Sequence, residues 1–302
     1  MTPAAVARLP ATAASPLFSR KGSIMTDAVS PFVPAGVAST RAAPGRGLRA
    51  AFANLSGWIA PALILAVWQA GSSLGYVSET LAPSPASVLA AAWRLTRSGE
   101  LPVSIGISFC RAIAGLIVGG GIGLAFGLAN GLSKLSESLS DSTLQMVRNV
   151  PHLALIPLVI VWFGIDEGAK LFLVALGVFF PVYVNTLHGV RSVDPHLIEM
   201  AESYGMGRAA LFRRVILPGA LPSIFVGLRY ALGVMWLTLI VAETIAAQSG
   251  VGYMAMQARE FMMTDVVVLS ILIYALLGKL ADTVVRALEC AFLPWRSFLL
   301  KD

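Results

Sequence analysis

Long, uninterrupted apolar blocks fill the sequence from Trp58 onward. Each block approaches the ~20 residues that an α-helix needs to cross the hydrocarbon core of a bilayer. Only 13% of all residues are charged, which is about half the level of soluble domains, so polar side chains cannot cover a surface facing water. The sequence therefore predicts an all-α polytopic membrane protein embedded in a lipid bilayer. The six predicted transmembrane helices are 57–76, 112–131, 144–164, 169–190, 221–246 and 265–285.

The first fifty residues differ from the rest in composition. Residues 1–50 are rich in Ala, Pro, Ser and Arg and show no hydrophobic periodicity, so they are expected to form a disordered cytoplasmic N-terminal extension. Met25 is an alternative start to Met1. Residues 51–302 are expected to form the transmembrane domain.

The Lys and Arg residues beside the spans indicate the orientation of the chain. With a cytoplasmic N-terminus, most of these residues lie on the inner side of the membrane, and six spans place both termini in the cytoplasm. The basic residues behind the net charge of +6 are therefore interpreted as signals that orient the chain in the membrane. No nucleic-acid partner is expected. The basic residues assigned to the outer side are Arg94, Arg97, Arg111, Lys170 and Arg259.

Three local patterns refine this topology. Pro151 and Pro157 lie inside the third span and are expected to bend it. Segments 85–98 and 252–263 are expected to form short helices at the outer interface. A stripe of glycines at every fourth position in the second span predicts close helix packing, within one subunit or along a dimer contact or conduit. These glycines are Gly115, Gly119, Gly123, Gly127 and Gly131.

Residues 192–218 are polar and connect the fourth and fifth spans on the cytoplasmic side. Asp194 is a suitable N-cap, with Pro195 at the first helical position. Gly205 suits the left-handed residue that follows a helix end. A second helix over 208–216 is expected to end at Pro218. The apolar residues of the first helix follow helical spacing: Leu197, Met200, Ala201 and Tyr204.

This pattern predicts a helix–turn–helix hairpin with one apolar face. One short hairpin cannot bury such a face by itself, so the face either lies on the inner leaflet or fits a groove of a partner protein.

The hairpin resembles the EAA motif of the permease subunits of binding-protein-dependent ABC importers, E-A-A-x3-G-x9-I-x-L-P. Met200 and Val215 replace the second Ala and the Ile of that motif, and both remain apolar. Residues 148–167, 170–195 and 233–246 are similar to the aliphatic sulfonate permease subfamily, whose relatives serve taurine and nitrate. The positions of the ATPase-coupling hairpin that carry the resemblance are Glu199, Ala201, Gly205, Val215, Leu217 and Pro218.

The resemblance implies a type I ABC importer (MetI-like) permease fold in the bacterial inner membrane. It also implies a permease homodimer, two copies of an ATP-binding subunit, and a periplasmic solute-binding protein that delivers the solute. In this family the hairpin inserts into a cleft of the ATPase subunit. The resemblance points to aliphatic sulfonates as the solute, with taurine and nitrate as alternatives.

The sequence contains no Walker A pattern, because Gly278-Lys279 is followed by Leu280 inside the last predicted span. ATP hydrolysis is therefore expected on a partner chain, and this chain is not expected to be an enzyme. His152, His188 and His196 are far apart in the sequence, so no metal site and no cofactor are expected.

Polar residues inside spans favour bundle interiors or water-lined paths. Candidate residues for the substrate path, with structural packing as the alternative for each, are Asn149, His152, Asn185, Thr238 and Glu243. Two other classes of protein remain open. An ion-coupled secondary transporter would show inverted repeats and charges near the membrane midplane. A membrane enzyme would show clustered His, Asp or Glu at one interface.

Overall fold

The structure, a computed structural model, describes residue 59, residues 63–74, residue 78 and residues 82–294. All of these residues belong to one compact unit, Leu55–Asp302. Their regular secondary structure is entirely helical, which confirms the predicted all-α class for this part of the chain. The predicted extension 1–50 lies outside the described residues, and the first predicted span lies partly outside them. The described portion of that span contains a short apolar helix, Leu63–Ser73.

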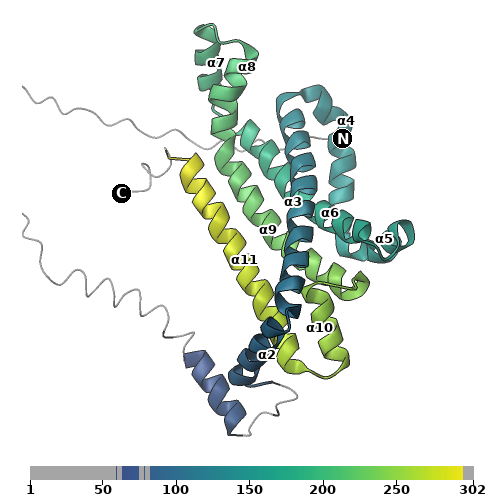
Figure 1. Cartoon of the computed structure of the whole chain (residues 1–302). Coiled ribbons are helices and arrows are strands. Elements are labelled where there is room, and N and C mark those ends of the chain that lie inside the picture. The colour runs from purple at the N-terminus through teal and green to yellow at the C-terminus, as the bar shows by residue number, and fades with distance from the viewer. Residues whose placement is uncertain (1–58, 60–62, 75–77, 79–81, 295–302) are drawn as a thin grey trace, which may run out of the picture. The chain divides into compact units, whose positions relative to one another are not determined.

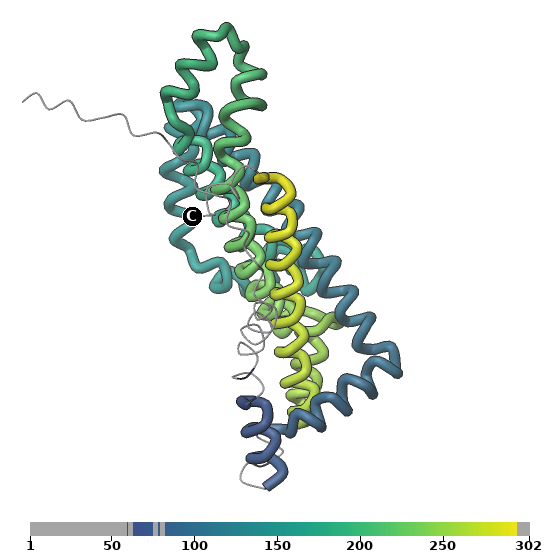
Figure 2. The backbone as a smooth tube through the Cα atoms, turned by 90° about the vertical axis from the view of Figure 1, so that its left-hand side faces the viewer, coloured from purple at the N-terminus to yellow at the C-terminus, as the bar shows by residue number. Residues whose placement is uncertain are grey.

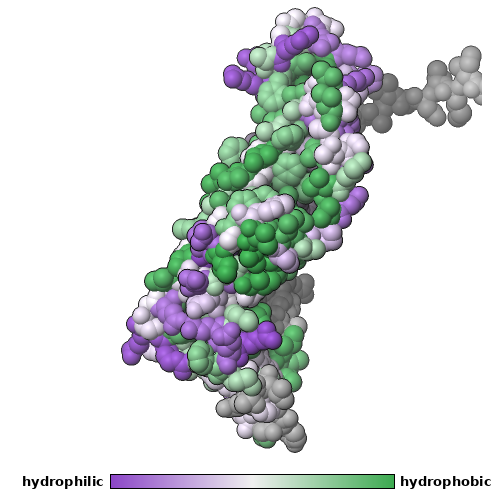
Figure 3. All heavy atoms as spheres, turned by 90° about the vertical axis from the view of Figure 1, so that its right-hand side faces the viewer, coloured by the Kyte–Doolittle hydropathy of each residue, from purple (hydrophilic) through white to green (hydrophobic). Residues whose placement is uncertain are grey.

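Four helices among the described residues are long and apolar enough to cross a membrane. They are α3 (Glu100–Leu132), α6 (Glu167–Arg191), the run that ends in α9 (Leu217–Ala246), and α11 (Thr264–Phe292). Helix α6 packs against both α3 and α9, and α9 also contacts α11 (Figures 1 and 2). The side shown in Figure 3 is hydrophobic across its middle and more hydrophilic toward its ends, as expected of a surface that meets lipid.

The predicted third span is broken into two parts. Helix α4 (Lys134–Arg148) is followed by the short 3-10 turn η1 (His152–Leu155) and by α5 (Ile156–Phe163), and the two parts are bent by 81°. The break falls where expected, because Pro151 lacks an N–H and disfavours helical geometry at the residue before it. The predicted bend is therefore confirmed, but it is much sharper than a kink. The described residues contain five spans if this bent pair counts as one.

The glycine stripe of α3 lies against α6. A Cβ atom added at Gly119 would lie 2.1 Å from the carbonyl oxygen of Ala175, and one at Gly123 would lie 2.6 Å from that of Phe179. The neighbouring backbone can approach this closely only because these positions lack side chains. The stripe therefore provides close packing inside one subunit, which is the first of the two predicted alternatives.

We expect Gly119→Val to destabilise the protein strongly, by at least the ~1–3 kcal/mol typical of an overpacked core, because the atoms in the way are backbone atoms that cannot rotate aside. The measurement is thermal unfolding of the purified protein in detergent. Gly121→Val is the matched control, since nothing lies within 4 Å of its added Cβ atom. Equal melting temperatures for the two variants would contradict this account of the α3–α6 contact.

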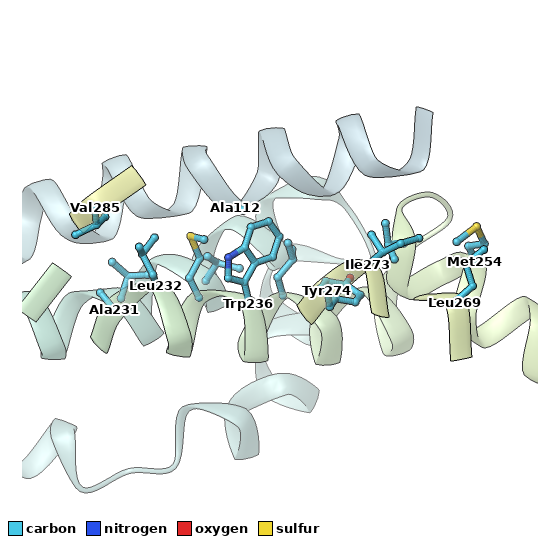
Figure 4. Packing of buried hydrophobic residues seen from close by; sticks show 14 of the residues in the cluster. Ala112, Ala231, Leu232, Trp236, Met254, Leu269, Ile273, Tyr274 and Val285 are labelled. Atoms are coloured by element: carbon cyan, nitrogen blue, oxygen red, sulfur yellow. The ribbon is translucent and has the colours of Figure 1, made fainter. Parts of the chain in front are cut away.

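Helices α9 and α11 share the main hydrophobic core with two short helices, α2 (Pro85–Arg97) and α10 (Val251–Glu260). Trp236 and Tyr274 meet edge to face with ring centroids 6.1 Å apart, in the middle of the cluster that Figure 4 shows. Helices α2 and α10 both contact α11. They lie at the end of the unit opposite to α7 (Pro195–Ser203) and α8 (Arg208–Leu211) (Figure 1). The two short helices predicted from the sequence therefore exist, and they share one end of the bundle.

Candidate functional site

The hairpin between α6 and α9 begins with α7 (Pro195–Ser203). The Asp194 side chain accepts a hydrogen bond from the His196 N–H at 2.9 Å, as expected of an N-cap. The turn is made by Gly205, which has φ +75°, and the Met206 N–H returns to the Ala201 carbonyl oxygen at 3.1 Å. This is the left-handed helix ending that the sequence predicts. The hairpin projects beyond the neighbouring helix ends (Figures 1 and 2).

The apolar face of α7 is largely uncovered. Ala201 is buried at 2% exposure, but Leu197 is 47% exposed, Met200 52% and Tyr204 79%. The Glu199 side chain is also exposed, at 75%. Since Ala201 is buried while the other apolar residues of α7 are open, the structure presents an apolar surface with a charged margin at the tip of a protruding element.

The second arm of the hairpin continues directly into the membrane helix. Helix α8 (Arg208–Leu211), the π-helical turn η2 (Phe212–Ile216) and α9 form one run of 39 residues, Arg208–Ala246. The predicted end at Pro218 is therefore wrong. The π turn shifts the hydrogen-bond register, so that the Leu217 N–H reaches the Phe212 carbonyl oxygen just before the proline. Pro218, which has no N–H to donate, follows directly after this shift. Val215, Leu217 and Pro218 are half-buried in this junction.

The break between α4 and α5 brings together two of the predicted path residues. His152 Nε2 lies 3.1 Å from the hydroxyl oxygen of Thr238 on α9. Both side chains meet at Gly177 of α6, where an added Cβ atom would lie 2.9 Å from the Thr238 hydroxyl and 3.5 Å from His152 Nε2. Thr238 is fully buried, whereas His152 is half-buried. His152 also lines a cavity of about 160 Å³.

The other predicted path residues take no part in the His152–Thr238 hydrogen bond. Asn149 is the exposed C-cap of α4. Asn185 donates a hydrogen bond to the Pro181 carbonyl oxygen at 2.8 Å, and an added Cβ atom at Gly227 of α9 would lie 2.5 Å from the Asn185 Cβ. Asn185 therefore lies in the α6–α9 contact.

Glu243 forms the centre of a buried polar cluster, at 1% exposure. Arg111 donates to it at 2.8 Å, and the Ser108 hydroxyl, the Tyr274 hydroxyl and the Gly252 N–H donate at the same distance. Because these donors come from α3, α10 and α11, the single carboxylate ties four helices together. All of its hydrogen-bonding capacity is used within the subunit.

Arg111 extends this cluster to the start of α6. Its Nε donates to Glu167 at 2.6 Å, and Lys170 donates to the same carboxylate at 2.9 Å. Arg111 and Lys170 are buried at 8% and 2% exposure, so two basic residues that served as orientation signals in the sequence are in fact internal ion-pair partners. Sequence reasoning missed this cluster, because Arg111 is 56 residues from Glu167 and 132 residues from Glu243 in the sequence.

No group of three His, Cys, Asp or Glu residues arranged to hold a metal ion occurs within the described ranges. The polar groups that meet here form hydrogen bonds and ion pairs with each other. The two candidate functional features are therefore the protruding hairpin and the cavity that His152 lines at the helix break.

Comparison with known families and proteins gives concordant matches. Residues 105–292 match the family described as binding-protein-dependent transport system inner membrane component. The chain is 60% identical to SsuC of Escherichia coli K12, named as an aliphatic sulfonates transport permease protein, over 81% of this chain and 94% of that protein. It is 44% identical to the SsuC protein of Bacillus subtilis 168, over 86% of this chain and 93% of that protein.

A more distant relative and one solved structure complete the comparison. The taurine transport system permease protein TauC of Escherichia coli K12 is 39% identical over 78% of this chain and 87% of its own length. The crystal structure of an amino acid ABC transporter with histidines contains a chain with a TM-score of 0.53 and 20% identity, covering 66% of this chain and 96% of that one. At that identity the likeness concerns the fold alone.

Proposed function

The chain belongs to the binding-protein-dependent transport system inner membrane components, and from that premise we propose that it is the permease subunit of an ATP-driven importer of aliphatic sulfonates. The observation that carries the solute class is the 60% identity over 94% of a relative named for aliphatic sulfonates. The protein is a multi-pass membrane permease. Partner chains supply ATP hydrolysis and the delivery of the solute.

In the proposed assembly the chain crosses the inner membrane six times. The bent pair α4–α5 and a helix over 57–76, of which Leu63–Ser73 is described, join the four long helices. Both termini and the hairpin lie in the cytoplasm, with residues 1–50 as a disordered extension. Two copies of the permease pair with two ATP-binding subunits and receive solute from a periplasmic binding protein. This chain itself is not catalytic, and ATP is hydrolysed on the partner.

We place ATPase coupling in the hairpin. Support comes from the open apolar face of α7 and from the continuous helical run that joins the second arm of the hairpin to the membrane helix. Ala201 and Gly205 set the shape of the turn, and Glu199 lies at the exposed margin. Movement of an ATPase cleft would be passed to α9 through Val215, Leu217 and Pro218, which join the hairpin to that helix.

We place the substrate path along the break between α4 and α5. Backbone that is not helical at membrane depth is tolerated where it lines a cavity or is buried in protein, and broken helices form the binding sites of many transporters. Asn149 and His152 are proposed to face the path. Thr238 orients the imidazole of His152, while Asn185 and Glu243 hold the helices that wall the path.

The test uses the complete complex, with its ATPase and binding protein, in proteoliposomes. We expect uptake of ethanesulfonate that requires ATP and the binding protein, with taurine and nitrate taken up less well. Faster uptake of taurine or nitrate would reassign the solute and keep the importer. Uptake that persists without the ATPase subunit and stops when an ion gradient is collapsed would show a secondary transporter instead.

A further inference from the structure

Two cavities lie beside the helix break and have one lining residue in common. The first, of about 160 Å³, is the cavity that His152 lines together with apolar residues such as Val150, Phe180 and Val234. The second, of about 370 Å³, lies between α4 and α6 and is lined by polar residues that include Glu137, Gln145, Tyr183 and His188. Arg148 lines both. Arg148 is therefore the residue at which the two cavities border each other.

The first cavity has the chemistry of a site for a small organic anion. Its volume is more than ten times the ~10–15 Å³ that one water molecule requires on the same measure. Most of its lining is apolar and suits a short alkyl chain. Arg148 offers a positive charge to an anion, and the imidazole of His152 can donate a hydrogen bond. An arginine presents paired N–H groups that match the oxygens of an anionic headgroup.

The charge of Arg148 is available to a ligand. The structure gives it no ion-pair partner within the described ranges, in contrast to Arg191 on the wall of the second cavity, which pairs with Glu137. Its side chain is exposed. Its position in the last turn of α4 also favours a cation there, because the C-terminal end of a helix carries partial negative charge. That favourable placement explains how an unpaired cation is tolerated at the break.

We propose that Arg148 is the anion-selecting residue of the path, which contacts the anionic headgroup of an organic solute as it moves from the apolar cavity into the polar one. The proposal rests on the proposed function as a solute passage and adds the residue that discriminates by charge. Rings of arginine or lysine select anions in other pores. A single contact of this kind holds the anion weakly, which suits a solute that must also leave.

The test measures the electrostatic preference of the cavity directly. In the complete complex with Cys110→Ala and Cys290→Ala, the substitution Val150→Cys introduces a thiol into the first cavity. Two reagents of similar size are compared, 2-sulfonatoethyl methanethiosulfonate, which is itself an alkanesulfonate, and its cationic trimethylammonium-ethyl analogue. We expect the anionic reagent to react faster with Arg148 present, and Arg148→Gln to lower the ratio of the two rates about tenfold.

Two further variants separate charge selection from a structural role. Arg148→Lys should retain most of the preference for the anionic reagent. Lys134→Gln, on the same helix but on neither cavity, should leave the ratio unchanged. A ratio that is insensitive to Arg148→Gln would overturn the proposal, and so would an equal fall in Lys134→Gln. Failure of the unsubstituted complex to import ethanesulfonate would instead contradict the proposed function, so the two failures are distinguishable.

Discussion

Gly205→Val is expected to reduce ATP-dependent sulfonate uptake by about thirtyfold, because forcing a β-branched residue into the left-handed region costs ~2 kcal/mol or more. Gly205 has φ +75°, and nothing lies within 4 Å of an added Cβ atom. The substitution therefore disturbs the backbone of the turn without a steric clash. We expect the hairpin to lose the shape that fits the ATPase while the membrane helices remain folded.

The measurement for this prediction is uptake by the reconstituted complex, together with co-purification of the ATPase subunit. Gly207→Val is the matched control, since Gly207 has φ −68° and also has open space around its added Cβ atom. Gly205→Asn should restore much of the activity, because asparagine tolerates the left-handed conformation. If Gly205→Val took up solute at the wild-type rate, the conformation of the hairpin turn would not be required for coupling.

Glu243→Leu is expected to destabilise the protein by ~3–5 kcal/mol, which is typical when one partner of a buried ion pair is removed. The substitution leaves the Ser108 and Tyr274 hydroxyls and the Gly252 N–H without the acceptor that they share. Thermal unfolding in detergent should show a fall in melting temperature of about 10 °C. The matched control is Glu260→Leu, at an exposed glutamate.

A double substitution tests the source of this instability. Arg111→Met combined with Glu243→Leu should cost less than the sum of the two single changes, because it removes both buried charges. Lys170 remains in that variant to pair with Glu167. Strict additivity of the three measurements would show that the Arg111–Glu243 pair is not energetically coupled.

Much of the architecture follows from local sequence signals. The apolar blocks predict the long helices, and Asp194, Pro195 and Gly205 predict the cap and turn of the hairpin because each acts on its own neighbours. The family follows from the spaced motif in the hairpin. The junction at Pro218 does not follow from the sequence. A π turn directly before a proline depends on how the whole helix packs against its neighbours, which local sequence signals do not give.

The candidate site is less visible in the sequence for a related reason. Arg111 is 56 residues from Glu167 and 132 from Glu243, so nothing in its neighbourhood distinguishes it from a residue at the membrane surface. Arg148 likewise looks like an ordinary helix-terminal arginine until the bend of 81° places it beside two cavities. The surroundings of Arg111 and Arg148 are set by the packing of segments that are far apart in the sequence.

The unbroken run from Arg208 to Ala246 also has a mechanical consequence. Its 39 residues span roughly 58 Å at the α-helical rise, so a tilt of about 5° moves one end by about 5 Å relative to the other. Such a helix acts as a lever arm. One of its ends joins the hairpin and the other carries Glu243, so a tilt that starts at the hairpin would also displace the ion-pair cluster at the other end of the helix.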